Sequence, residues 1–214
     1  MRVDFFFDPV CPWCWITSRW IAEVQSQRGL DVRWRTFSLL EKNRATMPAE
    51  YLERVQAGHN TLRIAEALRA SEGEAAVADF YTELGASIHN DKTSPDAIDL
   101  RTVLRSSRLA ESWAESARDE SWDAVINASM KEALDLAGDD VGVPLIAIDQ
   151  KRAYFGPVMT PAPQGKDALR LWDVVTTLTD MPYFYELKNS ARATPQFADR
   201  PNRLAPFDAE TSTA

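Results

Sequence analysis

The chain has 214 residues, of which 45% are hydrophobic, and a formal net charge of −8 at pH 7. Such a chain is long enough for one full-sized core, or for a core that carries an inserted subdomain. The acidic balance argues against a nucleic acid or an anionic membrane as the main partner. No apolar run approaches the roughly 18 residues of a membrane span, and Asp4 lies where a signal peptide would be apolar. We therefore expect a cytoplasmic protein that binds neither membranes nor nucleic acids.

The N-terminal part of the chain predicts a strand, a helix and a second strand. Residues 2–7 read as a strand whose three consecutive phenylalanines suggest burial on both faces. Apolar residues then recur at helical spacing over residues 11–27, and Gly29 supplies the end of that helix. Residues 30–38 alternate between apolar and basic side chains, which predicts a second strand.

Cys11 and Cys14 are the only cysteines, and they form the C-x-x-C motif Cys11-Pro12-Trp13-Cys14 between the first strand and the first helix. Thioredoxin-type folds present a redox dithiol in this way. Unpaired N–H groups and the macrodipole at a helix N-terminus stabilise a thiolate, which makes Cys11 the expected nucleophile. We expect Cys11 to be exposed and Cys14 to be the buried resolving thiol. Cys14 would then displace the adduct on Cys11 and leave a Cys11–Cys14 disulfide.

Two other interpretations of the cysteine pair are weaker. A structural disulfide across so short a loop would remove little entropy from the unfolded chain. A zinc site would need His59 and His89, and their spacing matches no Cys₂His₂ pattern. The sequence therefore favours a redox dithiol and predicts no metal.

The rest of the chain is first helical and then returns to strands. Residues from about 48 to 137 are helical with few strand signals, and Ser94 before Pro95 predicts a helix N-cap. Strand character returns at 145–148 and, after a short turn, at 153–155. A last clear helix is expected from about Gly165 to Leu178.

This order of elements predicts an α/β fold, in which a thioredoxin-like core is interrupted by an inserted all-helical subdomain. We assign residues 1–45 and 139–190 to the core and residues 46–138 to the insertion. Residues 191–214 form a polar, proline-dotted C-terminal tail that we expect to be extended or partly disordered.

Gly142-Val143-Pro144, directly before the third predicted strand, is the second motif of the site. An X-Pro bond is cis in only about 5–6% of cases in folded proteins, but its occurrence together with the C-x-x-C motif predicts a cis bond here. A cis proline in this fold faces the dithiol across a narrow groove. It would expose the backbone of Val143 for pairing with a substrate and place a non-ligating side chain beside the sulfurs.

Four more residues are candidates for the site, each with a plain structural alternative. Trp13 offers a flat apolar wall for a substrate, or it packs on the inserted helices. Asn43 and Tyr51 follow the second strand, where the chain passes the redox end of the sheet, so they would line a pocket or serve as an ordinary loop asparagine and an interface tyrosine. His89 ends a helix, where the dipole favours a histidine, and its catalytic role is left open.

Together these motifs resemble the DsbA-like branch of the thioredoxin superfamily and, more narrowly, the actinobacterial mycothiol-dependent nitroreductase family. The resemblance is carried by residues 8–20, 88–90, 140–144, 154–158 and 184–188. It implies a cytosolic homodimer with no tightly bound cofactor, whose dithiol is recycled by mycothiol or a related small thiol and by a protein such as a mycoredoxin. It also implies reduction of small electrophiles such as nitro-aromatic compounds.

The site residues match the family pattern to different degrees. Cys11, Trp13, Cys14 and Pro144 match the family pattern directly. Asn43 and Tyr51 match within a stretch that is shortened relative to the family. Position 143 is valine where the family commonly has threonine, so hydrogen bonding there is expected to differ.

Two other functions stay open at this point. Kappa-class glutathione transferases and a related isomerase share the inserted-helix architecture, but they typically have serine at the first active position and need no second thiol. The presence of both Cys11 and Cys14 is the feature against them. A non-catalytic redox sensor would instead use the disulfide to switch its affinity for a partner.

Overall fold

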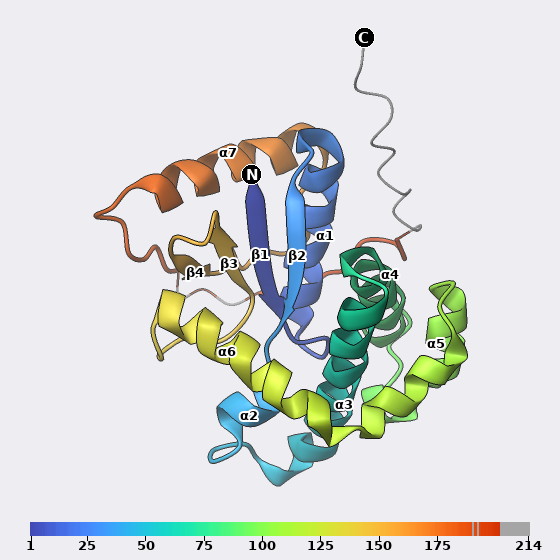
Figure 1. Cartoon of the computed structure of the whole chain (residues 1–214). Coiled ribbons are helices and arrows are strands. Elements are labelled where there is room, and N and C mark those ends of the chain that lie inside the picture. Colours follow the sequence, from blue (N-terminus) through green and yellow to red (C-terminus); the bar gives the residue numbers. More distant parts are fainter. Residues whose placement is uncertain (190, 192, 202–214) are drawn as a thin grey trace.

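A computed structural model describes residues 1–189, 191 and 193–201. Four strands form one sheet in the order β2-β1-β3-β4 (Figure 1). β1 runs parallel to β2, whereas β3 runs antiparallel to both β1 and β4. The strands are β1 (Arg2–Phe7), β2 (Asp31–Thr36), β3 (Leu145–Ile148) and β4 (Ala153–Phe155). This is the thioredoxin-like arrangement that the sequence predicted.

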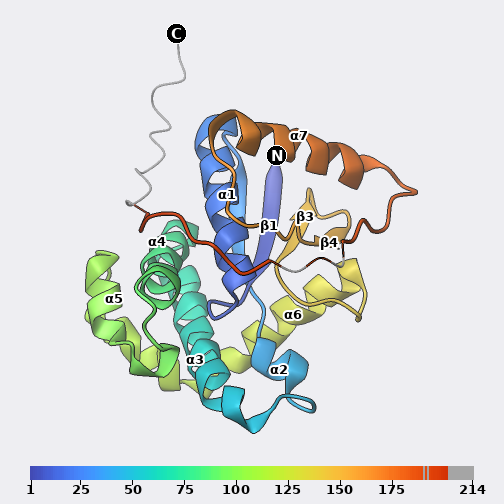
Figure 2. The same ribbon diagram turned by 180° about the vertical axis from the view of Figure 1, so that it is seen from behind.

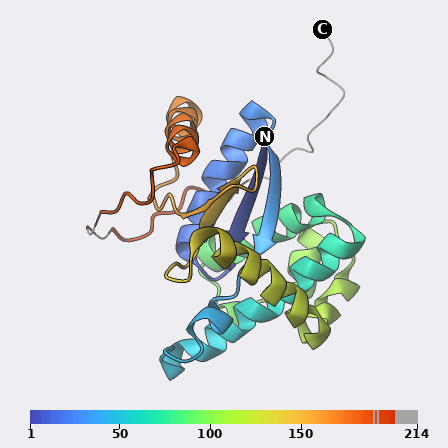
Figure 3. The same cartoon turned by 60° about the vertical axis from the view of Figure 1, so that its left-hand side comes forward.

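Helices cover both faces of the sheet. They are α1 (Pro12–Arg28) and α7 (Gly165–Asp180) behind the sheet of Figure 1 and α6 (Asp123–Ala137) in front of it. α7 packs on α1, where the Trp20 indole donates to the carbonyl of Ala168 at 2.9 Å. On the other side, the Ser129 hydroxyl of α6 donates to the carbonyl of Thr36 at 2.7 Å. Figure 3 shows the sheet between these helices.

The connection from β2 to α6 is helical, as predicted. It contains α2 (Leu39–Asn43), α3 (Ala49–Ser71), α4 (Glu74–Gly85), the π-helical turn η1 (Ala86–Asn90), α5 (Leu100–Ser106) and three 3₁₀ segments, η2 (Pro95–Ala97), η3 (Glu111–Arg118) and η4 (Glu120–Trp122). The helix expected after Ser94 is only the short η2, and Ser94 makes no capping bond. Its hydroxyl donates to the Asp96 carboxylate instead, which explains the missing cap.

The three phenylalanines of β1 are buried, as the sequence suggested, because helices lie over both faces of the strand. Phe5 packs edge-on against Trp34 of β2, with ring centroids 5.5 Å apart. Phe7 stacks on Tyr81 of α4 at 4.0 Å. One hydrophobic core therefore runs from the sheet into the helical segment, while the division into domains stays a prediction.

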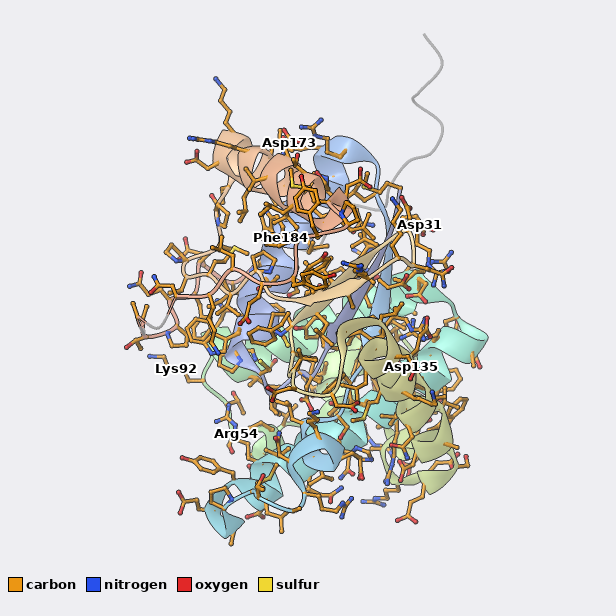
Figure 4. All side chains as sticks on the ribbon, turned by 90° about the vertical axis from the view of Figure 1, so that its left-hand side faces the viewer. Asp31, Arg54, Lys92, Asp135, Asp173 and Phe184 are labelled. Atoms are coloured by element: carbon orange, nitrogen blue, oxygen red, sulfur yellow. The ribbon has the colours of Figure 1, made fainter. Side chains whose placement is uncertain are left out.

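Some of the core helices and strands end at the residues that the sequence predicted. Gly29 ends α1 with φ at 61°, in the left-handed region that favours glycine. Within the β3–β4 connection, Asp149 and Gln150 have positive φ as the two central residues of a turn in which the Lys151 N–H donates to the Ile148 carbonyl at 3.2 Å. After α7 the chain returns to β4, where the Tyr154 hydroxyl donates to the carbonyl of Phe184 at 3.0 Å (Figure 4).

Two further predictions concern membrane-spanning segments and the C-terminal tail. Within the described residues, no helix is both long and apolar enough to pass through a bilayer. Of the predicted C-terminal tail, residues 192 and 202–214 lie outside the described residues. Residues 193–201 have no regular secondary structure but lie against the folded protein (Figure 2).

The packing of Gly85 against Trp15 gives a test of the fold. A Cβ atom added at Gly85 would lie 2.3 Å from Cε3 of Trp15, whose side chain is buried. We expect Gly85→Ala to lower the free energy of unfolding by about 1–3 kcal/mol, measured by urea denaturation. Gly142→Ala is the control, because its Cβ would meet no atom within 4 Å, and we expect a change below about 1 kcal/mol. Equal effects of the two substitutions would contradict this packing.

Candidate active site

The cysteine pair lies at the junction between β1 and α1, as predicted. Cys11 is the N-cap of α1, with φ −79° and ψ 114°, and Pro12 occupies the first helical position. Proline suits that position because its missing N–H would have no partner in the first turn. The sulfur of Cys11 accepts a hydrogen bond from the backbone N–H of Cys14 at 3.4 Å. A thiol group thus takes the place that a serine or aspartate oxygen fills in an ordinary helix cap.

The prediction that Cys11 is exposed is wrong. Its exposed fraction is 6%, compared with 0% for Cys14. The reason is the loop before β3, because the Cys11 thiol faces the carbonyl oxygen of Val143 at 3.6 Å. Both cysteines are free thiols in this structure. The expected order of exposure still holds, since Cys11 alone retains any accessible surface.

The Val143-Pro144 peptide bond is cis, as predicted. Val143 is buried, and its carbonyl is directed to the Cys11 sulfur. The carbonyl of Pro144 accepts from the N–H of Gly156 at 2.8 Å, which ties the loop to the end of β4. Two further cis bonds, Gly156-Pro157 and Thr160-Pro161, were not predicted, because an isolated X-Pro pair carries no local signal of its isomer.

Cys14 is held in its protonated form by its surroundings. Burial is the largest cause that raises the pKa of Cys14 well above its usual value, and the Cys11 thiol raises it further. The Asp8 carboxylate acts in the same direction, whereas a hydrogen bond from the Asp8 backbone N–H opposes the shift. A thiol becomes a nucleophile only as its thiolate. The arrangement therefore suits a second thiol that reacts after the first.

Asp8 is a site residue that the sequence reasoning missed. Its carboxylate is fully buried and accepts from the backbone N–H groups of Val10, at 3.0 Å, and Leu39, at 2.8 Å. Burial raises the pKa of Asp8 to about 6, although both hydrogen bonds favour its charged form. Asp8 thereby joins the loop that carries Cys11 to the start of α2. An acidic residue between a buried strand and a C-x-x-C motif was the available signal.

His89 and Asn90 brace the same loop. The carbonyl of Pro9 only accepts, so the 2.8 Å contact means that Nε2 of His89 carries a proton and donates it. Burial lowers the pKa of His89 to about 4, the Arg54 charge adds to this, and the bond to Pro9 opposes it. The side-chain oxygen of Asn90 accepts from the Trp15 indole at 3.1 Å. These contacts give His89 a structural role beside the dithiol.

The other predicted site residues are less tightly placed. Trp13 is half-buried and packs on the core. Asn43 is also half-buried, and its amide donates to the carbonyl of Leu39 at 3.0 Å within α2. Tyr51 lies on the first turn of α3 with 53% of its surface exposed. Their part in substrate binding stays a prediction. Among the described residues, no three His, Cys, Asp or Glu side chains gather in a way that could hold a metal ion.

The opposite pKa shifts of Asp8 and His89 predict opposite effects of pH on the free energy of unfolding. Because the pKa of Asp8 is raised from 3.8 to about 6, its stabilising contribution is complete below about pH 4 and is lost as the pH rises through 6. Because the pKa of His89 is lowered from 6.5 to about 4, the unfolded chain binds its proton more tightly, and stability increases from about pH 4 to 6.5. At 1.36 kcal/mol per pKa unit, each effect is about 3 kcal/mol, so the two largely cancel.

Urea denaturation between pH 4 and 7 would separate these two contributions. We expect Asp8→Asn to leave the histidine effect unopposed, so that its stability rises more steeply with pH than that of the unmodified protein. His89→Gln should show the reverse difference. Comparison with the unmodified protein removes the contribution of the other carboxyl groups. Parallel pH curves for all three proteins would show that the two groups do not titrate as described.

Comparison with known proteins places this site in a family. A protein from Mycobacterium tuberculosis described as uncharacterized protein Rv2286c is 32% identical over 189 residues, which cover 87% of this chain and 80% of that protein. A structure described as a probable DsbA oxidoreductase from Streptomyces coelicolor aligns with a TM-score of 0.58 and 17% identity, over 94% of this chain and all of the other. The cytosolic disulfide reductase DsbM from Pseudomonas aeruginosa, solved with GSH, aligns at 0.55 and 16%, over 83% of this chain and all of DsbM.

At these identities the two structures establish the fold, which is that of the DsbA-like proteins. The family itself follows from the match of residues 10–189 to the model of the Rv2466c-like family, described as mycothiol-dependent nitroreductase Rv2466c. The matched range contains Cys11, Cys14, His89 and the Val143-Pro144 pair. The chain therefore belongs to the Rv2466c-like family of mycothiol-dependent nitroreductases.

Proposed function

We propose that this chain is a cytosolic dithiol oxidoreductase that uses Cys11 and Cys14 to reduce small electrophiles such as nitro-aromatic compounds, with mycothiol as its reductant. The observation that carries the proposal is the position of the Cys11 sulfur. It caps α1, accepts the N–H of Cys14 and faces the Val143 carbonyl. Membership of a family described by mycothiol dependence and nitroreduction supports the choice of reductant and substrate.

The chemistry needs two thiols that act in order. Cys11 attacks the substrate as a thiolate and forms a covalent adduct. Cys14 then loses its proton and displaces the adduct, which oxidises the pair to a disulfide and delivers two electrons. With two protons, two electrons convert a nitro group to a nitroso group and one water. Two molecules of mycothiol return the disulfide to the dithiol and leave as mycothiol disulfide.

The low exposure of Cys11 favours a small substrate. A folded protein partner would need a wide opening at the sulfur, whereas only 6% of Cys11 is accessible. Half-buried Trp13 supplies an apolar surface next to the pair on which an aromatic ring could stack. In this proposal Val143 and Pro144 bound the opposite side, and Asn43 and Tyr51 contact the substrate from α2 and α3.

Further parts of the proposal follow from the family. The chain would act as a homodimer, and a mycoredoxin would assist its recycling. Residues 1–45 and 139–190 would form the redox core, with residues 46–138 as the inserted subdomain. A pure thiol transferase needs no second cysteine, so the paired thiols favour a reductase.

Substitution of each cysteine should give a different result. We expect Cys11→Ser to abolish mycothiol-dependent consumption of a nitro-aromatic substrate, because the attacking sulfur is lost. Cys14→Ser should stop the reaction one step later, with the substrate adduct on Cys11; where a mycothiol thiol displaces that adduct in place of Cys14, the reduced substrate leaves and a Cys11–mycothiol mixed disulfide remains. Absorbance of the nitro compound measures the first effect, and intact-protein mass spectrometry measures the second.

Each cysteine variant serves as the control for the other, since both remove one buried sulfur at the same helix turn. Full turnover by Cys11→Ser would refute the dithiol mechanism. Turnover of a model disulfide with dithiothreitol, but none of nitro compounds with mycothiol, would keep the oxidoreductase and overturn the proposed substrate and reductant.

A further inference from the structure

Residues 195–200 lie beyond the region that matches the family, yet they contact the surroundings of the dithiol. Figure 2 shows this segment in red, crossing α1 and ending beside α4. The match to the family ends at residue 189. The proposed function assigns nothing to this segment.

The segment is attached to η1 and to residues on either side of it through three kinds of contact. The Asn90 side chain donates to the carbonyl of Ala198 at 2.6 Å. The ring of Phe197 lies 5.5 Å from that of His89. Arg200 forms ion pairs with Asp91 and, at 2.9 Å, with Glu83. At its other end the segment is held by Thr160, whose hydroxyl accepts from the N–H of Gln196 at 2.7 Å.

The residues that the segment contacts also hold the dithiol loop and the first turn of α1. The His89 ring stacks on that of Trp15, with ring centroids 6.0 Å apart, and also contacts the tilted ring of Phe197. It donates to the Pro9 carbonyl. Asn90 binds the Trp15 indole with its oxygen and the segment with its nitrogen. Trp15 follows Cys14 directly in the chain.

We propose that residues 195–200 act as a latch that holds His89 and Asn90 in place. In this proposal His89 is a positioning residue that keeps Cys14 inaccessible to reagents, while Cys11 is the sulfur that a substrate reaches first. The inference rests on the proposed function only in taking the cysteine pair as the reactive group. Cys14 is fully buried, so a reagent reaches it only when this region opens locally. Loss of the latch should make such opening more frequent without unfolding the whole protein.

Alkylation of Cys14 by iodoacetamide tests the latch, in a Cys11→Ser background so that a single thiol reacts. We expect the double substitution Phe197→Ala and Arg200→Ala to increase the alkylation rate about tenfold, which corresponds to about 1.4 kcal/mol in the free energy of opening. Because the lost contacts belong to the native state alone, the free energy of unfolding should fall by a similar amount. The alkylation rate should nevertheless stay nearly independent of urea below the unfolding transition, as expected for a local opening that exposes little surface. Lys151→Ala is the control, because it removes an exposed ion pair with Asp180 and should leave the rate unchanged.

Two substitutions at position 89 test the positioning role. His89→Leu removes the donor to Pro9 and should accelerate alkylation, whereas His89→Gln retains an N–H donor at a similar distance and should restore the slow rate. An unchanged rate in the double variant, or a rate that rises with urea as steeply as global unfolding does, would overturn the latch. Equal rates for the leucine and glutamine variants would overturn the role of His89. None of these measurements uses mycothiol or a nitro compound, so they are independent of the proposed substrate.

Discussion

The hydrogen bond from the N–H of Cys14 to the sulfur of Cys11 is the contact on which the site depends. It makes a thiol the cap of α1, so the positive end of the helix and the second cysteine are presented to the same sulfur. Cys11 can occupy this cap because β1 ends at Phe7 and the next residue, Asp8, begins a turn in which the Cys11 N–H donates to the Asp8 carbonyl at 3.1 Å. The strand, the turn and the helix cap are one structural unit.

Close packing around this turn explains why Cys11 is nearly enclosed. Asp8 binds the N–H of Leu39, and His89 binds the carbonyl of Pro9. A Cβ atom on Gly58 of α3 would lie 2.6 Å from a methyl group of Val10, so only glycine lets α3 approach this closely. With the loop held from three sides, only a small fraction of the Cys11 surface is accessible.

Local sequence signals were sufficient for the fold and for the cysteine pair, because strand periodicity, the cap at Gly29 and the C-x-x-C motif act within a few residues. Long-range contacts decided the rest. The burial of Cys11 depends on Val143, which is 132 positions away. The role of His89 depends on Pro9, 80 positions away. Neither contact leaves a local pattern, so exposure was predicted for Cys11 and the function of His89 was left open.

A serine, a histidine and an aspartate also line up inside the helical segment, but their surroundings assign them to structure. Ser38 lies 2.8 Å from Nδ1 of His59, whose Nε2 is 3.1 Å from Asp123. The Ser38 hydroxyl is fully buried and accepts from the N–H of Glu41 as the cap of α2. The Ser38 hydroxyl is thus engaged as a helix cap and is not accessible to solvent. The array instead joins α2 to α3 and α6. Since the Leu39 N–H of α2 binds Asp8, the array also secures these helices to the loop that carries Cys11.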